Sequence, residues 1–271
     1  MYDQQINRGN PGCIVFLIDQ SASMNEPFAG THRTKATALA GAVNQLIRNL
    51  VIQCQRGEEI RDYLELGIIG YGSAAEPAFG GRLSSQQLVP ISAVADYPAR
   101  MATESMPGNP DLSIDRPVWV DPVARGATRM TAAIDLAGSF LVNWANAHQS
   151  SFPPIVLNFS DGQATDGDPR PIAGQLRNIV TDDGSLLMFN INLSSAPGVP
   201  IEYPSSPAGL PNPYAAGLFD MSSELTPFML TAAQEMGLTV APGARGFVYN
   251  ADPSRLSEFL DVGTRVPLTE H

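Results

Sequence analysis

Short apolar runs alternate along this chain with longer segments whose apolar residues recur every three or four positions. Residues 13–18 form an unbroken apolar run, which is typical of a strand buried on both faces. In residues 39–51 the spacing by three and four predicts an amphipathic helix of about five turns. The same two patterns predict strands at 64–71, 155–159, 185–191 and 246–249, and helices at 134–148, from 168, at 223–236 and from 252.

This alternation of strands and helices predicts an α/β fold, with a doubly wound, mostly parallel sheet and helices on both faces. Two stretches rich in proline and glycine interrupt it, at 74–127 and 194–217. The first shows little periodicity beyond one or two short strands. The second holds six prolines, which neither a helix interior nor a central strand tolerates, and predicts an extended surface loop. We therefore expect a single domain over 1–271, with a core at about 11–262 and these two stretches as insertions.

The charge of the chain excludes several function classes. It carries 16 lysines and arginines against 27 acidic residues, a net charge of −11, which argues against nucleic acid as a partner. Lys35 is the only lysine and follows Thr34, so a Walker-type nucleotide loop, which needs lysine after glycine, is excluded. The chain also has neither a Gly-x-Ser-x-Gly elbow nor a Gly-x-Gly-x-x-Gly cofactor turn, and we expect no enzymatic activity.

Cysteine use and hydropathy favour a cytoplasmic protein. Cys13 and Cys54 both stand in apolar segments, where free thiols serve as core residues in a reducing compartment. Residues 1–12 are polar and have no apolar signal segment. No apolar run reaches the roughly 18 residues that a membrane helix needs, so no membrane contact is expected.

Oxygen-bearing side chains follow two of the predicted strands and precede one helix. Asp19, Ser21 and Ser23 come directly after the first strand, and Asp161 follows the strand at 155–159. Thr128 stands just before the helix at 134–148. Ligands of parallel α/β sheets bind beyond the carboxyl ends of the strands, where these side chains are expected. Carboxylates and hydroxyls are hard donors that suit Mg²⁺ or Mn²⁺.

These residues carry a resemblance to the von Willebrand factor A (VWA) domain, also called the integrin I-type domain. Its metal-ion-dependent adhesion site (MIDAS) has an Asp-x-Ser-x-Ser motif, a loop threonine and a later aspartate, which this chain matches with Asp19, Ser21, Ser23, Thr128 and Asp161. The resemblance implies that the hydroxyls bind Mg²⁺ or Mn²⁺, that the aspartates act directly or through water, and that a partner protein supplies Glu or Asp to the metal. The chain resembles intracellular bacterial VWA proteins without other domains, and this resemblance implies an adaptor that acts beside a kinase, a phosphatase or an AAA+ ATPase.

The same residues also permit other interpretations. The serines suit a helix cap, and the whole protein suits either an extracellular adhesion domain or a scaffold with a vestigial metal site. Asp168 is expected to cap a helix, and Asp166 to be solvated, because their spacing does not fit a calcium loop. Arg129 and Trp119 are candidate contacts to a partner at the rim of the metal site, although Trp119 equally suits the core of a peripheral strand.

Overall fold

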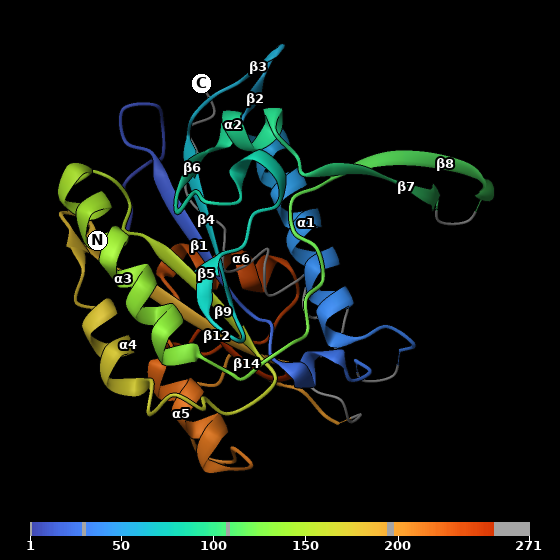
Figure 1. Cartoon of the computed structure of the whole chain (residues 1–271). Coiled ribbons are helices and arrows are strands. Elements are labelled where there is room, and N and C mark those ends of the chain that lie inside the picture. Colours follow the sequence, from blue (N-terminus) through green and yellow to red (C-terminus); the bar gives the residue numbers. More distant parts are fainter. Residues whose placement is uncertain (1, 29–30, 107–108, 194–197, 252–271) are drawn as a thin grey trace.

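The computed structural model describes residues 2–28, 31–106, 109–193 and 198–251. Its centre is a sheet in the order β13-β14-β12-β9-β1-β4-β5, with β6 also beside β4 (Figure 1). The strand bounds are β1 (Gly12–Asp19), β4 (Leu64–Tyr71), β5 (Ala75–Pro77), β6 (Val89–Pro90), β9 (Ile155–Ser160), β12 (Leu187–Leu193), β13 (Ile201–Glu202) and β14 (Phe247–Ala251). The inner pairs β4–β1, β1–β9, β9–β12 and β12–β14 are parallel, and β5, β6 and β13 add antiparallel edges.

Helices cover both faces of this sheet. They are η1 (Ala22–Asn25, 3-10), α1 (Lys35–Gln53), η2 (Gly81–Leu83, 3-10), α2 (Ile91–Asp96), α3 (Met130–Ala147), α4 (Arg170–Leu176), α5 (Pro213–Met221) and α6 (Pro227–Glu235). Buried residues of α1, α2 and α6 belong to one hydrophobic cluster, and those of α3, α4 and α5 to another. Strand β1 divides its side chains between the two, with Phe16 in the first and Leu17 in the second. The predicted doubly wound, mostly parallel fold is confirmed.

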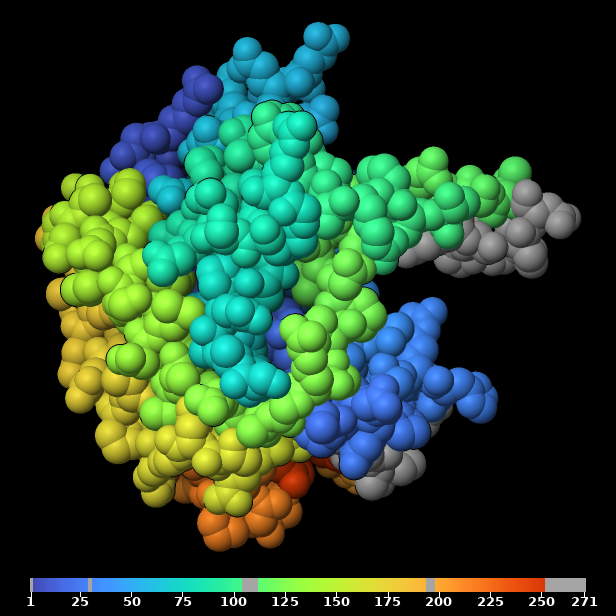
Figure 2. Space-filling model, viewed as in Figure 1, coloured from blue at the N-terminus to red at the C-terminus, as the bar shows by residue number. Residues whose placement is uncertain are grey.

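In the described part of the chain, three antiparallel pairs lie outside the main sheet. They are β2 (Gln55–Arg56) with β3 (Glu59–Ile60), β7 (Arg100–Met106) with β8 (Asn109–Val118), and β10 (Val180–Thr181) with β11 (Gly184–Ser185). The β7–β8 hairpin projects from the body of the molecule as an arm (Figure 2). No helix in the described part of the chain is long and apolar enough to span a membrane.

Both stretches expected to be insertions contain more regular structure than the sequence predicts. Between 74 and 127 the chain forms β5, η2, β6, the short helix α2 and the long hairpin. The prediction of an extended loop over 194–217 is wrong from residue 213 onward, because Pro213 begins α5 and the Asn212 side chain caps it. Proline is tolerated at the first helical position, where its missing N–H has no partner to lose. The edge strand β13 also lies in this stretch, and the helix expected from 252 lies outside the described residues.

Candidate metal centre

The candidate site lies where the strand order reverses. From β1 the chain passes to its neighbour β4 and later crosses to β9, on the other side of β1. Asp19 is the last residue of β1 and Ser160 the last residue of β9, so both emerge at the same edge of the sheet. Such a switch point opens a crevice between neighbouring strand ends, and is the usual ligand site of open α/β sheets.

Asp19 is held beneath the site by hydrogen bonds to both of its oxygens. Oδ1 accepts the backbone N–H of Ser21 at 2.8 Å, and Oδ2 accepts the Ser160 hydroxyl at 3.1 Å and the Asp161 N–H at 3.4 Å. Asp19 is only 2% exposed. This burial raises the pKa of its carboxyl from 3.8 to about 6, although the hydrogen bonds act in the opposite direction. The hydrogen bonds therefore do not fully compensate the ionised Asp19 carboxylate for the water that it loses on burial.

Hydroxyl groups connect the two strand ends. The Ser21 and Ser23 hydroxyl oxygens lie 3.0 Å apart, and Ser23 Oγ donates to Asp161 Oδ1 at 2.8 Å. Ser21 precedes η1 but its side chain makes no capping hydrogen bond, so helix capping does not account for its hydroxyl. Four of the five predicted ligand residues thus form one connected set.

Thr128 lies in the loop before α3, and this loop is hydrogen-bonded to the turn that follows β1. The Arg125 N–H donates to the Gln20 carbonyl at 2.6 Å, and the Ala22 N–H donates to the Gly126 carbonyl at 3.1 Å, which fixes this loop against the β1 turn. Thr128 is buried, and its hydroxyl makes no hydrogen bond to another residue that the structure describes. The Thr128 hydroxyl oxygen is therefore not engaged by another described residue and is available as a metal ligand.

Lys35 is also part of this site, which the sequence did not predict. Lys35 Nζ lies 2.5 Å from Asp161 Oδ2 and 3.1 Å from Glu26 Oε2. Both Lys35 and the Asp161 carboxylate are withdrawn from solvent, with side chains 2% and 0% exposed. The only available signal was that this lone lysine begins the helix that follows the Asp-x-Ser-x-Ser turn.

The donor set fits a small, hard dication. The described residues contain no group of three or more His, Cys, Asp or Glu that would hold a metal, so a site built on imidazole, thiolate or several carboxylates is absent there. What they offer instead is two carboxylates, Asp19 and Asp161, together with the hydroxyls of the serines and Thr128. Two negative charges match one dication, and hydroxyl and water ligands suit Mg²⁺ or Mn²⁺.

The remaining residues singled out from the sequence fall into three places. Arg129 is exposed at the start of α3, next to Thr128. Trp119 is 2% exposed and its indole N–H donates to the Val94 carbonyl, so of its two predicted places the core is correct and the rim of the site is not. Asp166 is not merely solvated, because it accepts the N–H groups of Thr131 and Ala132 in the first turn of α3.

Two further expectations concern a helix start and the cysteines. Asp168 accepts the backbone N–H of Arg170 at 3.1 Å and pairs with its guanidinium, but the N-cap position of α4 is held by Pro169, so the prediction of Asp168 as the capping residue is one position off. The pairing lowers the pKa of the exposed Asp168 carboxyl. Cys13 and Cys54 are both free and buried, as predicted.

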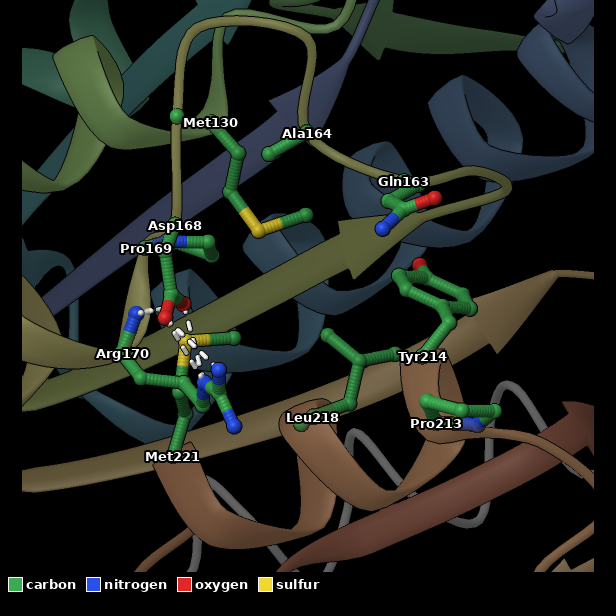
Figure 3. Close-up of a pocket in the computed structure, with 12 residues that line it drawn as sticks. Met130, Gln163, Ala164, Asp168, Pro169, Arg170, Pro213, Tyr214, Leu218 and Met221 are labelled. Carbon is green, nitrogen blue, oxygen red and sulfur yellow. Dashed lines mark hydrogen bonds and ion pairs between the residues drawn. The ribbon is translucent and has the colours of Figure 1, made fainter.

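A pocket of about 390 Å³ borders the site (Figure 3). It lies between the start of α3, the segment that follows Asp161, and α5, and Met130, Ala164, Tyr214 and Leu218 contribute to its lining. The Tyr214 hydroxyl is buried close to Ser160 and Asn192, yet forms no hydrogen bond of ordinary geometry within the described structure. Burial raises the pKa of Tyr214, so this hydroxyl remains protonated.

We expect Gly126→Ala to weaken metal binding by about tenfold, the equivalent of one to two kcal/mol of local strain. Gly126 has φ +83, and a Cβ there would lie 2.4 Å from the Ser73 backbone nitrogen, so the loop that carries Thr128 must shift. Gly162→Ala is the matched control, because a Cβ next to Asp161 meets nothing within 4 Å. Titration with Mn²⁺ measures both affinities. Equal affinities in the two variants would show that the loop does not position a ligand.

Comparison with known proteins supports the fold. No protein-family model matches the chain, and no curated protein matches it. Among solved structures, a von Willebrand factor type A protein from Catenulispora acidiphila aligns with a TM-score of 0.50 and 14% identity, over 95% of this chain and 43% of that one. Proximal thread matrix protein 1 of the mussel byssus aligns with a TM-score of 0.48 and 12% identity, over 93% of this chain and 47% of that one. A manganese-loaded TRAP protein of Plasmodium vivax aligns with a TM-score of 0.43 and 14% identity, over 93% of this chain and 72% of that one.

The first of these similarities shows that the chain has the α/β fold of VWA domains. At such low identity the likeness concerns the fold and not the function. The chain spans less than half the length of the Catenulispora and mussel proteins.

Proposed function

We propose that the chain is a protein-binding module that uses a divalent metal, Mg²⁺ or Mn²⁺, to engage an acidic side chain of a partner protein. The observation that carries this proposal is the connected set of Asp19, Ser21, Ser23 and Asp161 at the switch point. Thr128 lies in the loop that is hydrogen-bonded to the turn after β1. Ser21, Ser23 and Thr128 would supply hydroxyl ligands to the ion. Asp19 and Asp161 would balance its charge, directly or through water.

A partner carboxylate suits such a centre for reasons of charge. Without the metal, the two aspartates would repel a further Glu or Asp side chain. With the metal, their charge is neutralised and the added carboxylate can coordinate the ion, so its binding depends on the metal. Arg125 and Arg129 are both exposed next to the Thr128 loop and offset the acidity of the rest of the molecule. We include Arg129 as a rim contact on this ground.

The wider role is also a proposal. An adaptor beside a kinase, a phosphatase or an AAA+ ATPase would need binding without catalysis. Hydroxyl-rich metal sites suit that role, because they offer little basic character for activating water. The cytoplasmic location and the absence of nucleic-acid or membrane partners stay predictions of the sequence. A scaffold with a vestigial site remains the competing function, and the pairing of Lys35 with Asp161 is the observation that favours it.

The test is metal-dependent thermal stability. We expect Mn²⁺ at about 100 times its dissociation constant to stabilise the protein by roughly 2.7 kcal/mol, which raises the unfolding midpoint by several degrees relative to EDTA. The double variant Ser21→Ala/Ser23→Ala should lose this shift. Ser84→Ala/Ser85→Ala, which removes two exposed hydroxyls after η2, should keep it. If Mn²⁺ does not raise the unfolding midpoint of the unaltered protein, the result would favour a scaffold with a vestigial site.

Partner chemistry is tested with peptides that differ at one residue. A glutamate-containing peptide that binds in Mn²⁺ should be released by EDTA, and its glutamine counterpart should not bind. In the same assay Arg129→Ala should weaken peptide binding and leave the affinity for Mn²⁺ unchanged. Undiminished binding would remove Arg129 from the rim.

A further inference from the structure

We propose that Lys35 is a built-in cation of the metal site, which neutralises Asp161 when no metal is bound and thereby lowers the affinity of the site for a divalent ion. The inference rests on the proposed metal function and concerns how that site is regulated. Its consequence is that Lys35 and the metal compete for one carboxylate.

The contacts divide Asp161 between two sets of partners. Oδ1 accepts the Ser23 hydroxyl at 2.8 Å, on the side of the proposed ligands, while Oδ2 lies 2.5 Å from Lys35 Nζ. Lys35 is 2% exposed, so its ammonium has exchanged most of its water for these carboxylates. A second pairing, with Glu26 at 3.1 Å, completes the arrangement. The ammonium is thus held beside the donor set.

The position of Lys35 in α1 makes a role in stabilising that helix implausible on physical grounds. Lys35 is the first residue of α1, and Thr34 already supplies the cap by accepting the Thr37 N–H. A cation is disfavoured at a helix N-terminus, where the backbone dipoles place partial positive charge. Its burial carries a further desolvation penalty. Both effects are offset by the carboxylates that Lys35 contacts. The charge of Lys35 is therefore stabilised by the acidic residues of the site and not by the helix that it begins.

The charges around the site support competition. The buried Asp19 and Asp161 contribute two negative charges, and Lys35 contributes one positive charge, whereas the Glu26 side chain is 57% exposed and its charge is largely screened by water. In a site withdrawn from water, like charges repel with little screening by salt. A dication that enters next to Asp161 therefore meets the ammonium as a competitor for that carboxylate. Without Lys35 the two buried aspartates would attract the ion more strongly.

A purely structural role for Lys35 makes the opposite prediction. If the ion pair only tied α1 to the end of β9, then its loss would loosen Asp161 and weaken metal binding. Competition instead predicts tighter binding after the charge is removed. The direction of the change in metal affinity therefore distinguishes the two roles.

The experiment is calorimetric titration of the full chain with Mn²⁺ alone at neutral pH. We expect Lys35→Met, which keeps the length of the apolar stem, and Lys35→Gln, which keeps a hydrogen-bond donor, to bind Mn²⁺ about tenfold more tightly or more than the unaltered protein. Arg33→Met is the matched control, because it removes one positive charge two residues away from an exposed position. It should change the affinity by less than about twofold.

Thermal unfolding gives a second measurement. Lys35→Met should lower the midpoint in EDTA, because the buried Asp161 carboxylate loses its partner, and should show a larger rise on addition of Mn²⁺ than the unaltered protein. If Lys35→Met fails to fold, Lys35→Gln decides the question.

The outcomes separate this inference from the proposed function. Unaltered protein that binds Mn²⁺ while both Lys35 variants bind it equally or more weakly would overturn competition and leave the metal function intact. Binding by the Lys35 variants but not by the unaltered protein would support competition in its strongest form. Failure of all four proteins to bind Mn²⁺ would overturn both.

Discussion

Replacement of Asn158 by leucine is expected to lower the free energy of unfolding by about 3 kcal/mol. Asn158 is fully buried in β9, where its Oδ1 accepts the Tyr71 hydroxyl at 2.8 Å and its Nδ2 donates to Asn190 Oδ1 at 2.9 Å. Asn190 in turn donates to the Ser222 hydroxyl at 2.9 Å. Leucine matches the shape of asparagine but leaves Asn190 Oδ1 buried without a donor, which is the costly part of the change.

Thermal or denaturant unfolding measures this effect. A loss of about 3 kcal/mol corresponds to a fall in midpoint of roughly 6–12 °C for a chain of this size. Asn143→Leu, on the exposed face of α3, is the control and should be close to neutral. The double variant Asn158→Leu/Asn190→Leu should lose less than the sum of the single variants, because it removes both partners of one hydrogen bond. Strict additivity would contradict a coupled network beneath the site.

Asp19→Asn should abolish the stabilisation by metal and yet stabilise the metal-free protein at pH 7. Burial raises the pKa of Asp19 from 3.8 to about 6. The folded protein therefore holds this proton more tightly than the unfolded chain, and its free energy of unfolding falls as the pH rises from about 4 to 6. The full difference is about 3 kcal/mol. Asparagine avoids this penalty but offers one acceptor oxygen in place of two, so we expect a net gain of about 1–3 kcal/mol.

Unfolding in EDTA across this pH range tests the prediction. The contribution of Asp19 should be lost between about pH 4 and pH 6 in the unaltered protein and be absent in Asp19→Asn. Asp135→Asn, at an exposed position of α3, controls for the loss of one negative charge. A metal-free Asp19→Asn protein that is less stable than the unaltered one at pH 7 would show that the hydrogen bonds to Asp19 outweigh its desolvation. The site would then carry no penalty for the metal to offset.

The sequence predicted most of the fold because burial leaves a local pattern. Residues 13–18 read as a strand buried on both faces, and β1 does send alternate side chains into two separate clusters. The spacing of apolar residues by three and four likewise predicted helix α1. The errors came where local rules permit two outcomes. Pro213 was assigned to a loop because proline disfavours helix interiors, although it is acceptable at the first helical position that it occupies.

The candidate site divides in the same way. Asp19, Ser21 and Ser23 are close in sequence, and the strand pattern puts Asp161 at the same sheet edge, so a short motif and the period of the strands were sufficient to group them. Trp119 was undecided between rim and core, because a single aromatic residue in a short apolar segment fits both. Its burial and its hydrogen bond to the Val94 carbonyl assign it to the core.

The sequence by itself therefore determined the layered α/β architecture and the placement of Asp19, Ser21, Ser23 and Asp161 at one edge of the sheet, since both follow from local patterns of strands and turns. Only the tertiary structure decided that Lys35 pairs with Asp161, 126 positions away, and that Asn158 joins Tyr71 and Asn190 across three strands. Such contacts depend on how the crossover connections bring distant elements together, and no local pattern of polarity records which buried charge or amide will meet which partner.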